Sequence, residues 1–373
     1  MHPKAPGVAA VTRGPEQRPL RRGWTTGACA TAAVKSAYGA LVGLGFADPV
    51  TIRLPRGGEA SFALAERRLD TDMATAAVIK DAGDDPDVTH GCLVRATVRP
   101  GAPGAGLTFQ AGEGVGVVTR PGLQLPPGEA AINPMPRQMM RDAVADVAAA
   151  AGSPADLVIT IAIPGGEALA AKTLNGRLGI VGGLSILGTT GIVVPYSCAA
   201  WVHSIHRGID VARAAGVTHV AAATGSTSER TVRHLYRLPD IALIDMGDFV
   251  GGTLKYLRRH PVPRLSLAGG FAKLAKLGQE HMDLHSARSQ LDLAALARLA
   301  TAHGAAAALA RALTEANTAN QALSLATAAG FPLGDLVAAQ ARDVARGVGG
   351  AGVAIEVLVV DRQGNIAGRA AGW

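Results

Sequence analysis

Small hydroxyl residues and a glycine follow an apolar run in residues 220–236, VAAATGSTSERTVRHLY, and their pattern suits the binding of an anion. The apolar run predicts a strand and the segment after it predicts a helix, which places residues 224–227, TGST, in the turn between them. The first backbone N–H groups of a helix have no partner within the helix, so they attract negatively charged groups. This turn is therefore a candidate anion-binding site.

An acidic residue follows this turn at a spacing typical of nucleoside sites. The next predicted strand, IALID, ends at Asp245, about twenty residues after Gly225. In dinucleotide sites an acidic residue at this position binds the ribose hydroxyls. The turn has no G-x-G-x-x-G, and strands of any α/β unit can end in polar residues, so a purely structural turn is the alternative. The predicted cofactor-binding residues, which include the end of a third strand, are Thr224, Gly225, Ser226, Thr227, Asp245 and Gly270.

Three further side chains are candidates for catalysis. Asp248 lies at the predicted start of a helix, where capping the helix is an alternative role. His281 and His285 are four residues apart in HMDLH, a spacing that can bind a metal if the segment is helical. The segment lacks the glutamate of the H-E-x-x-H motif, and no third metal-binding residue is evident. The alternatives are that the histidines contact an acidic substrate or cofactor, or that they have only a surface or packing role. The sequence predicts no resident metal site.

The glycine-rich stretch in residues 182–191, GGLSILGTTG, has two readings. Its backbone N–H groups can surround an anion, or its glycines can let two segments pack closely. No Gly-Lys-Ser/Thr follows, so the stretch is not a P-loop. The sequence alone leaves both readings open.

The composition restricts the class of partner. The 373 residues are 48% hydrophobic and carry a net charge of +7, but only 3% are aromatic. Proteins that bind single-stranded nucleic acid usually stack bases on aromatic side chains, so this class is disfavoured. The basic excess indicates either a solvated surface or a small ligand with many carboxylates or phosphates. No nucleic-acid partner is expected.

The cysteines and the apolar segments suggest a cytoplasmic protein. The three cysteines form no CxxC pair, their number is odd, and the N-terminus lacks the apolar core of a signal peptide. Residues 178–202 carry no charge, but they contain five glycines and a proline. This stretch predicts buried strands and turns rather than a membrane span.

The predicted elements divide the chain into two parts after a flexible extension, residues 1–20. Residues 21–200 begin with an Ala-rich helix, and VTIRLP and SFALAERRL are each predicted as one strand. They also contain a Pro-rich loop, residues 120–140, before a helix that starts near Met139. This part is an α+β domain with a largely antiparallel sheet. In residues 201–373 strands and helices alternate, which predicts a doubly wound parallel α/β domain with additional C-terminal helices.

Five stretches of the chain resemble one family. They are GWTTGACATAAVKSA, AGEGVGVVTRPGLQLPPGEAAINPMPR, GTTGIVVPYS, GDFVGGTLKYL and LAGGFAKLAKLGQEHMDLHS. They resemble the cobalt-precorrin-5B C-1 methyltransferases of corrin-ring (vitamin B12) biosynthesis, over nearly the whole chain. The resemblance implies S-adenosylmethionine as methyl donor and a ring-contracted tetrapyrrole as acceptor, with cobalt only as part of the substrate. The implied product is cobalt-precorrin-6A.

A polycarboxylate acceptor suits a basic protein, because Arg side chains hold carboxylates with two parallel hydrogen bonds. The predicted substrate-binding residues are Arg120, Arg137, Arg141, Thr26, Thr189 and Thr190. Two alternatives are a tetrapyrrole carrier without catalysis and a nucleotide-using transferase that acts at the Gly188 turn. Whether the chain forms a homo-oligomer is left open.

Overall fold

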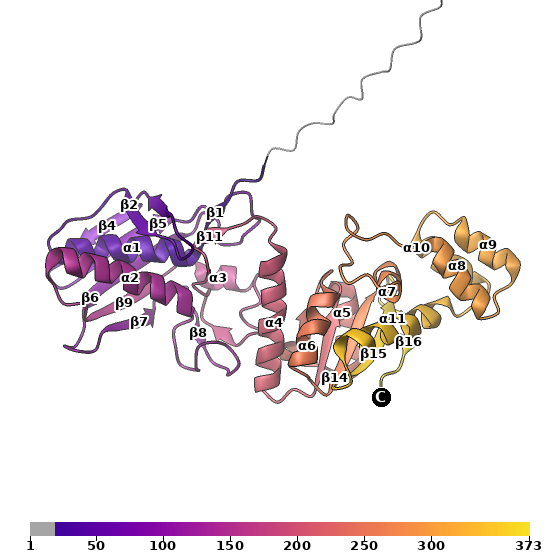
Figure 1. The fold of residues 1–373 in the computed structure, drawn as a ribbon. Helices are drawn as coiled ribbons and strands as arrows, with labels where there is room; N and C mark the ends of the chain where they lie inside the picture. The colour runs from indigo at the N-terminus through magenta and orange to yellow at the C-terminus, as the bar shows by residue number, and fades with distance from the viewer. Residues whose placement is uncertain (1–18) are drawn as a thin grey trace, which may run out of the picture.

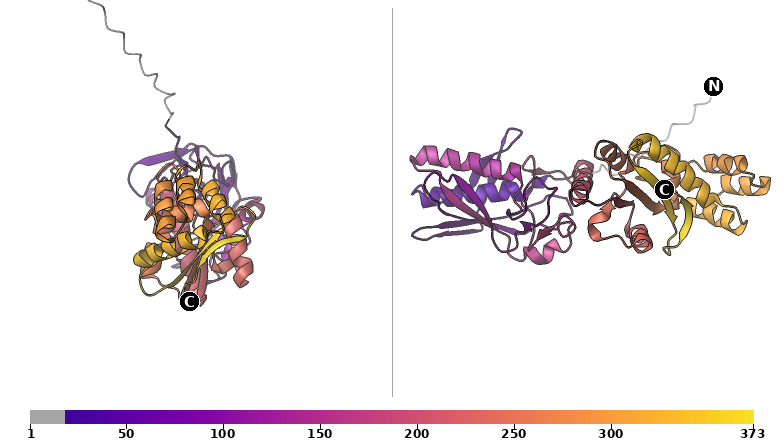
Figure 2. Two further views of the ribbon diagram at one scale, coloured as in Figure 1. Left: turned by 90° about the vertical axis from the view of Figure 1, so that its right-hand side faces the viewer. Right: turned by 90° about the horizontal axis from the view of Figure 1, so that it is seen from below.

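The computed structural model describes residues 19–373, so the predicted extension over residues 1–20 lies almost entirely outside the described part. Two β-sheets with their own helices lie on either side of α4 (Cys198–Ala214), as Figures 1 and 2 show. The mixed α/β class expected from the sequence is confirmed. Within residues 19–373, no helix combines the length and the apolar character that crossing a bilayer requires.

The first sheet is largely antiparallel. Its strand order is β4-β5-β6-β9-β7, and only the β7–β9 pairing at one edge is parallel. Its strands are β4 (Glu66–Leu69), β5 (Ala74–Ile79), β6 (Leu93–Pro100), β7 (Leu107–Ala111) and β9 (Leu157–Ala162). Helix α1 (Thr26–Leu41) contacts both this sheet and α2 (Pro134–Ala151), and its small side chains allow nearly all of its residues to be buried.

Short ladders complete this part of the molecule. The antiparallel pairs are β1 (Gly23–Trp24) with β11 (Ile192–Val193), β2 (Val50–Arg53) with β3 (Glu59–Phe62), and β8 (Val117–Val118) with β10 (Ile180–Val181). The short helix α3 (Gly166–Ala170) follows β9. The β1–β11 ladder joins the start of α1 to the segment that leads into α4.

The second sheet is mostly parallel. Its order is β13-β12-β14-β15-β16, and only the β15–β16 hairpin is antiparallel. Its strands are β12 (His219–Ala223), β13 (Leu243–Asp245), β14 (Arg264–Gly270), β15 (Ala354–Val360) and β16 (Ile366–Ala370). Both faces are buried, because Val220 and Ala222 join one hydrophobic cluster and Ala221 joins another.

Helices cover the two faces of this sheet unequally. Helix α5 (Ser226–Tyr236) packs alone on the smaller cluster, through Val232. The larger cluster receives side chains from α4, α6 (Val250–Arg259), α7 (Phe271–Gly278), α8 (Leu293–Ala302), α9 (Ala307–Thr314), α10 (Ala319–Ala328) and α11 (Leu333–Gly349). The strand that follows β12 along the chain, β13, lies on one side of β12, and the next strand, β14, lies on its other side. The sheet therefore has a topological switch point between β12 and β14, the place where open α/β sheets bind ligands.

Three sequence predictions need correction. The segment 120–140 is not a loop throughout, since α2 begins at Pro134 rather than near Met139. Proline is tolerated in the first turn of a helix, where its missing N–H needs no partner. SFALAERRL is not one strand but the end of β3 followed by β4, and β5 was not predicted. Residues 178–202 are buried only in part: Ile180, Leu184 and Ile186 are covered, but the two strands are only two residues long and five large apolar side chains are exposed.

Candidate functional site

A cleft of about 670 Å³ lies at the switch point of the parallel sheet. The turns after β12 and β14, the helix α10 and the turn between β15 and β16 form its walls. Five of the six predicted cofactor-binding residues line it, namely Thr224, Gly225, Ser226, Thr227 and Gly270. Packing of α10 against α7 closes one side of this cleft, which sequence periodicity could not foresee.

The amino terminus of α5 opens into this cleft. Gly225 precedes the helix in an extended conformation, and no side chain caps the terminus. The Ser228 hydroxyl donates to the Gly225 carbonyl at 2.9 Å, so it leaves the first N–H groups free. A Cβ added to Gly225 would meet nothing within 4 Å, so the turn faces open space. The helix terminus therefore offers backbone donors to a negatively charged group.

Lys273 connects two of the strand ends. Its ammonium group lies 2.9 Å from the Asp248 Oδ1 atom and donates to the Thr224 carbonyl at 3.3 Å. The Asp248 Oδ1 atom is buried and accepts no hydrogen bond. The nearby positive charge of Lys273 compensates its negative charge, although the geometry of this ion pair is not that of a hydrogen bond. Phe249, not Asp248, is the N-cap of α6. The capping alternative for Asp248 is therefore wrong, and its carboxylate instead contacts Lys273, which lines the cleft.

Asp245 lies at the carboxyl end of β13, the strand next to β12, and does not line the cleft. It pairs in register with Ala223, and the next residue along, Met246, donates its N–H to the Ala223 carbonyl at 3.0 Å. Burial, and then the carboxylate of Glu229, raise the pKa of Asp245, while Arg177 partly opposes them. Arg177 is held in turn by two hydrogen bonds to Glu229, of 2.7 and 2.8 Å.

The loop that carries the two candidate histidines is not helical. Helix α7 ends at Gly278, so His281 and His285 are not neighbours on a helix face, and the metal reading that depended on this loses its support. No cluster of three or more potential metal ligands occurs in residues 19–373. The loop does lie against the Asp248 turn, since Leu284 donates its N–H to the Asp248 carbonyl at 2.9 Å. Buried Lys276 holds the loop by donating to the Leu284 carbonyl at 3.2 Å.

The three arginines predicted for the substrate do not reach this cleft. Arg137 donates to the carbonyls of Ile132 and Ala130 and to the carboxylate of Glu129, at 2.8, 3.0 and 2.8 Å. These bonds brace the Pro-rich loop against α2 and leave little for a ligand. Arg141 lies over the ring of Phe109, as Arg137 does. Arg120 is exposed, with its stem against Gly179.

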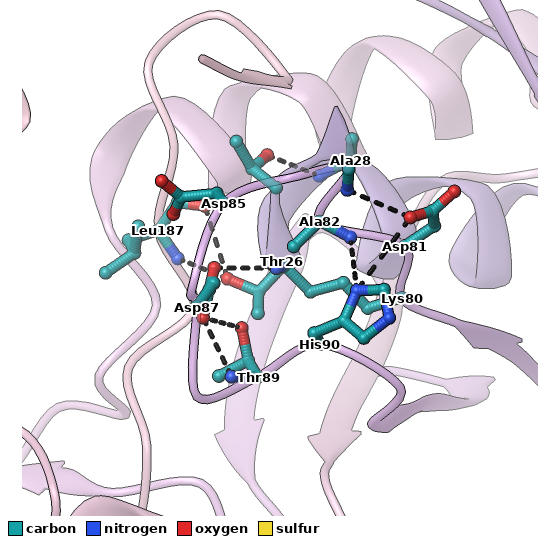
Figure 3. Close-up of polar contacts among 12 residues, drawn as sticks. Thr26, Ala28, Lys80, Asp81, Ala82, Asp85, Asp87, Thr89, His90 and Leu187 are labelled. Atoms are coloured by element: carbon teal, nitrogen blue, oxygen red, sulfur yellow. Dashed lines mark hydrogen bonds and ion pairs between the residues drawn. The ribbon is translucent and has the colours of Figure 1, made fainter. Parts of the chain in front are cut away.

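The predicted threonines differ in their availability. The Thr26 hydroxyl is buried and bonded to the backbone of Leu187, accepting from its N–H at 3.0 Å (Figure 3). The Thr190 hydroxyl bonds the backbone of Ile192. Thr189 is exposed and has no side-chain hydrogen bond among the described residues. Of the three, only Thr189 presents its hydroxyl to solvent.

A buried ion pair lies beside Thr26. Lys80 is 1% exposed, and its ammonium donates to the Asp87 carboxylate at 2.7 Å (Figure 3). Asp87 also accepts from the N–H and the hydroxyl of Thr89, at 2.7 and 2.6 Å. Because every charge here has a partner, this cluster supports the fold around the start of α1 rather than offering a site.

The glycine-rich stretch is a packing device. A Cβ at Gly183 would lie 2.3 Å from the backbone of Gly114, and one at Gly188 would lie 2.5 Å from the side chain of Thr25. The backbone of Gly166 also meets Gly114. These close approaches of chain segments indicate that the glycines of this stretch allow close packing. They do not favour the alternative, in which the Gly188 turn surrounds an anion.

Sequence reasoning missed several residues of the cleft. Lys273, Asn320 and Arg362 line it. Lys273 follows the third strand end, a position visible in the sequence, but it is not among the predicted cofactor-binding residues. Asn320 and Arg362 come from a distant helix and a hairpin turn, and no local pattern marks them.

The fold and the cleft define a class: a two-sheet α/β protein whose parallel sheet has a ligand cleft at its switch point. Comparison with known proteins narrows this class. The family model described as CbiD matches residues 13–195, and the model described as CbiD, C-terminal domain, matches residues 283–371. The chain belongs to the CbiD family of cobalt-precorrin-5B C(1)-methyltransferases.

Relatives carry that name over almost their whole length. The cobalt-precorrin-5B C(1)-methyltransferase of Bradyrhizobium sp. (strain BTAi1) is 59% identical, with 97% of this chain and 96% of that chain aligned. Those of Brucella anthropi and Paramagnetospirillum magneticum are 57% and 59% identical, over 97% and 95% of this chain and 99% of each relative. A crystal structure of the cobalamin biosynthesis protein cbiD from Archaeoglobus fulgidus aligns with a TM-score of 0.39 and 25% identity. That alignment covers 72% of this chain and 83% of the solved one.

Proposed function

We propose that this chain methylates C-1 of cobalt-precorrin-5B, giving cobalt-precorrin-6A, with S-adenosylmethionine as the donor. The observation that carries the reaction is the 59% identity, over 97% of the chain, to a relative named cobalt-precorrin-5B C(1)-methyltransferase. The cobalt ion belongs to the substrate. The acceptor is a tetrapyrrole with many carboxylate arms, which agrees with the net charge of +7.

The strand-end cleft supports the choice of donor. S-adenosylmethionine combines an amino-acid carboxylate with a nucleoside, and a cleft of about 670 Å³ has room for a ligand of that kind. The free N–H groups at the start of α5, with Lys273 at the rim, suit the carboxylate. Asp245, at the end of the neighbouring strand, suits the ribose hydroxyls.

The protein's own part in the reaction is then alignment. The donor supplies a methyl group already activated by its positive sulfur. An electron-rich ring carbon forms the new C–C bond while the S–CH3 bond breaks and its electron pair stays on sulfur. Holding the two reactants in line accounts for roughly 7–11 kcal/mol of barrier lowering in well-oriented reactions. Asp248 contacts Lys273 of the cleft, and the loop of His281 and His285 lies against the Asp248 turn. These three remain the candidates for contact with the reacting ring.

Calorimetric titration tests the donor site. The wild type should bind S-adenosylmethionine and its demethylated product, but not ATP. Asp245→Asn should weaken donor binding about tenfold or more, since a hydrogen bond to a charged group contributes roughly 1.5–3 kcal/mol. Asp240→Asn is the matched control, because Asp240 lies before β13, at the opposite end of the same strand.

Other outcomes support the rival functions. Binding of ATP instead of S-adenosylmethionine would indicate a nucleotide-using transferase. Binding of the tetrapyrrole without transfer of a labelled methyl group would indicate a carrier. An unchanged donor affinity in folded Asp245→Asn would leave Asp245 as a polar strand end only.

A further inference from the structure

The uncharged segment before and at the start of α4 exposes an unusual amount of apolar surface. Five of the fourteen exposed large apolar side chains in residues 19–373 lie within residues 181–201. We call the last three of them, Val194, Tyr196 and Trp201, the connector face, since they lie on the segment that joins the two sheets (Figure 1). Their side chains are 49%, 67% and 47% exposed. Exposed apolar side chains that are concentrated in one short segment, rather than scattered singly over the surface, are typical of a binding surface.

Contacts hold the indole ring of Trp201 and the backbone of Tyr196 in place. The Trp201 indole N–H donates to the Asp245 carbonyl at 3.3 Å, and one side of the ring lies against Gly247. Tyr196 has a φ of 54°, a conformation rare for an aromatic residue, and its N–H donates to the Asp85 carboxylate at 2.8 Å. Backbone strain of this kind persists where neighbouring structure imposes it, and it concentrates at ligand sites.

The connector face lies beside the proposed donor cleft. Trp201 contacts the end of β13, and β12, whose end forms the cleft, is the next strand of the sheet. Adjacent strands are about 4.8 Å apart. The Asp248–Lys273 pair bridges the same interval, because Asp248 follows β13 and Lys273 lines the cleft. A flat ligand on the connector face would therefore have one edge at the mouth of the cleft.

We propose that the connector face binds the macrocycle of the tetrapyrrole acceptor and turns its reacting edge toward the donor cleft. This inference rests on the proposed function. A macrocycle is flat and apolar at its centre and carboxylated at its periphery, and the uncharged segment with exposed Tyr and Trp matches the centre. Arg288 lies at the rim: its guanidinium is 58% exposed, lies 3.5 Å from the Cys198 Sγ atom and forms an ion pair with Asp283 at 2.8 Å, so a substrate carboxylate would compete with Asp283 for it. The absence of charge over residues 178–202 then has a functional reason.

Tryptophan fluorescence tests the proposal, with a stable cobalt corrin that carries free carboxylates as the probe. The chain has three tryptophans, so Trp201→Phe should remove most of the quenching that the probe causes. Trp373→Phe is the matched control. Trp373 is similarly exposed, at 45%. It packs on His219 and Arg264, at the amino ends of β12 and β14, whereas the cleft lies at the carboxyl ends of these strands.

Affinities complete the test. Trp201→Ala should weaken probe binding at least tenfold and weaken the binding of S-adenosylmethionine far less, because toward the donor site it removes only a hydrogen bond to the main-chain carbonyl of Asp245. Tyr196→Asn should act in the same direction, since Asn tolerates the left-handed conformation. Unaltered probe affinity in both folded variants would overturn the proposal. So would a wild-type dimer that Trp201→Ala converts to monomer, because the face would then bind a second copy of the chain. A wild type that binds neither probe nor donor would instead refute the proposed function.

Discussion

Arg137 illustrates how the partners of a single side chain decide its role. Its guanidinium is only 13% exposed as a side chain and makes three hydrogen bonds to the end of the Pro-rich loop. Arg141, one turn further along α2, shares the contact with Phe109 and has no side-chain hydrogen bond among the described residues. The two arginines are therefore a natural pair for comparison.

Arg137→Ala should lower the free energy of unfolding by about 1–3 kcal/mol, because carbonyls that it now satisfies lose their donor. Arg141→Ala should change it by less than about 0.5 kcal/mol, as an exposed substitution does. Urea unfolding of both variants measures the difference. A raised acceptor KM in Arg137→Ala without loss of stability would restore the substrate role first assigned to it.

The Lys80–Asp87 pair gives a prediction with a defined pH dependence. Burial raises the pKa of Asp87. The hydrogen bonds from Lys80 and Thr89 lower it by more than burial raises it, so the pKa lies below the ordinary value. The unfolded chain therefore takes up this proton before the folded protein does. The stabilising contribution of Asp87 is present above the ordinary Asp pKa of about 4 and is lost as the pH falls below it.

Asp87→Asn should cost about 3–5 kcal/mol at pH 7, because it leaves the ammonium of Lys80 buried without an opposite charge. The penalty should shrink as the pH is lowered. Asp146→Asn breaks the exposed pair with Arg53 and should cost less than about 1 kcal/mol. Thermal melts of both variants at pH 7 and at about pH 3, below the ordinary Asp pKa, make the comparison, and equal losses at pH 7 would contradict it.

At the scale of elements, the meeting of Gly114, Gly166 and Gly183 holds three segments of the first part together. The segments are the turn after β7, the start of α3 and the stretch after β10. Their backbones approach so closely that any Cβ must displace another main chain. Glycine is the residue that permits such an approach. Close packing therefore explains Gly114 in the stretch AGEGVG, one of those that resemble the family, without a ligand.

Gly183→Ala should destabilise the protein strongly, by about 3 kcal/mol or more, as overpacking against a rigid backbone does. Gly176→Ala, in the same region, has nothing within 4 Å of the added Cβ and should have little effect. Expression level and melting temperature of the two variants separate them. Equal stability would show that the segments can move apart without cost.

At the scale of the whole molecule, the two sheets have separate hydrophobic clusters. One cluster gathers α1, α2 and the first sheet, and the other gathers the parallel sheet with α4 and α6 to α11. The Arg177–Glu229 ion pair, with side chains 29% and 15% exposed, links the two parts. Two separate cores favour two cooperative unfolding units.

Calorimetry should therefore resolve two transitions. A donor that binds in the proposed cleft should raise only the transition of the parallel sheet, by the amount that its affinity dictates, because it would stabilise that folded unit alone. Gly183→Ala should lower only the other transition. A single transition that shifts with both changes would show that the two clusters unfold as one.

The sequence determined those features that depend on local pattern. The alternation of strands and helices after residue 217, the β12–α5 turn with its free N–H groups and the family of the chain could all be read from periodicity and motif. Five of six cofactor candidates line one cleft because strand ends of a parallel sheet always meet at one edge.

Only the tertiary structure decided which side chains are free. Arg137 is committed to Ile132 and Glu129, and Asp248 faces Lys273 rather than capping α6. Several large apolar side chains of the uncharged segment, among them Tyr196 and Trp201, are exposed instead of buried. Each of these outcomes depends on contacts between segments far apart in the chain, or on where two sheets happen to leave a surface open. Hydrophobic periodicity reports which residues one element can bury, but it does not report which partner will cover them, so these assignments required the fold.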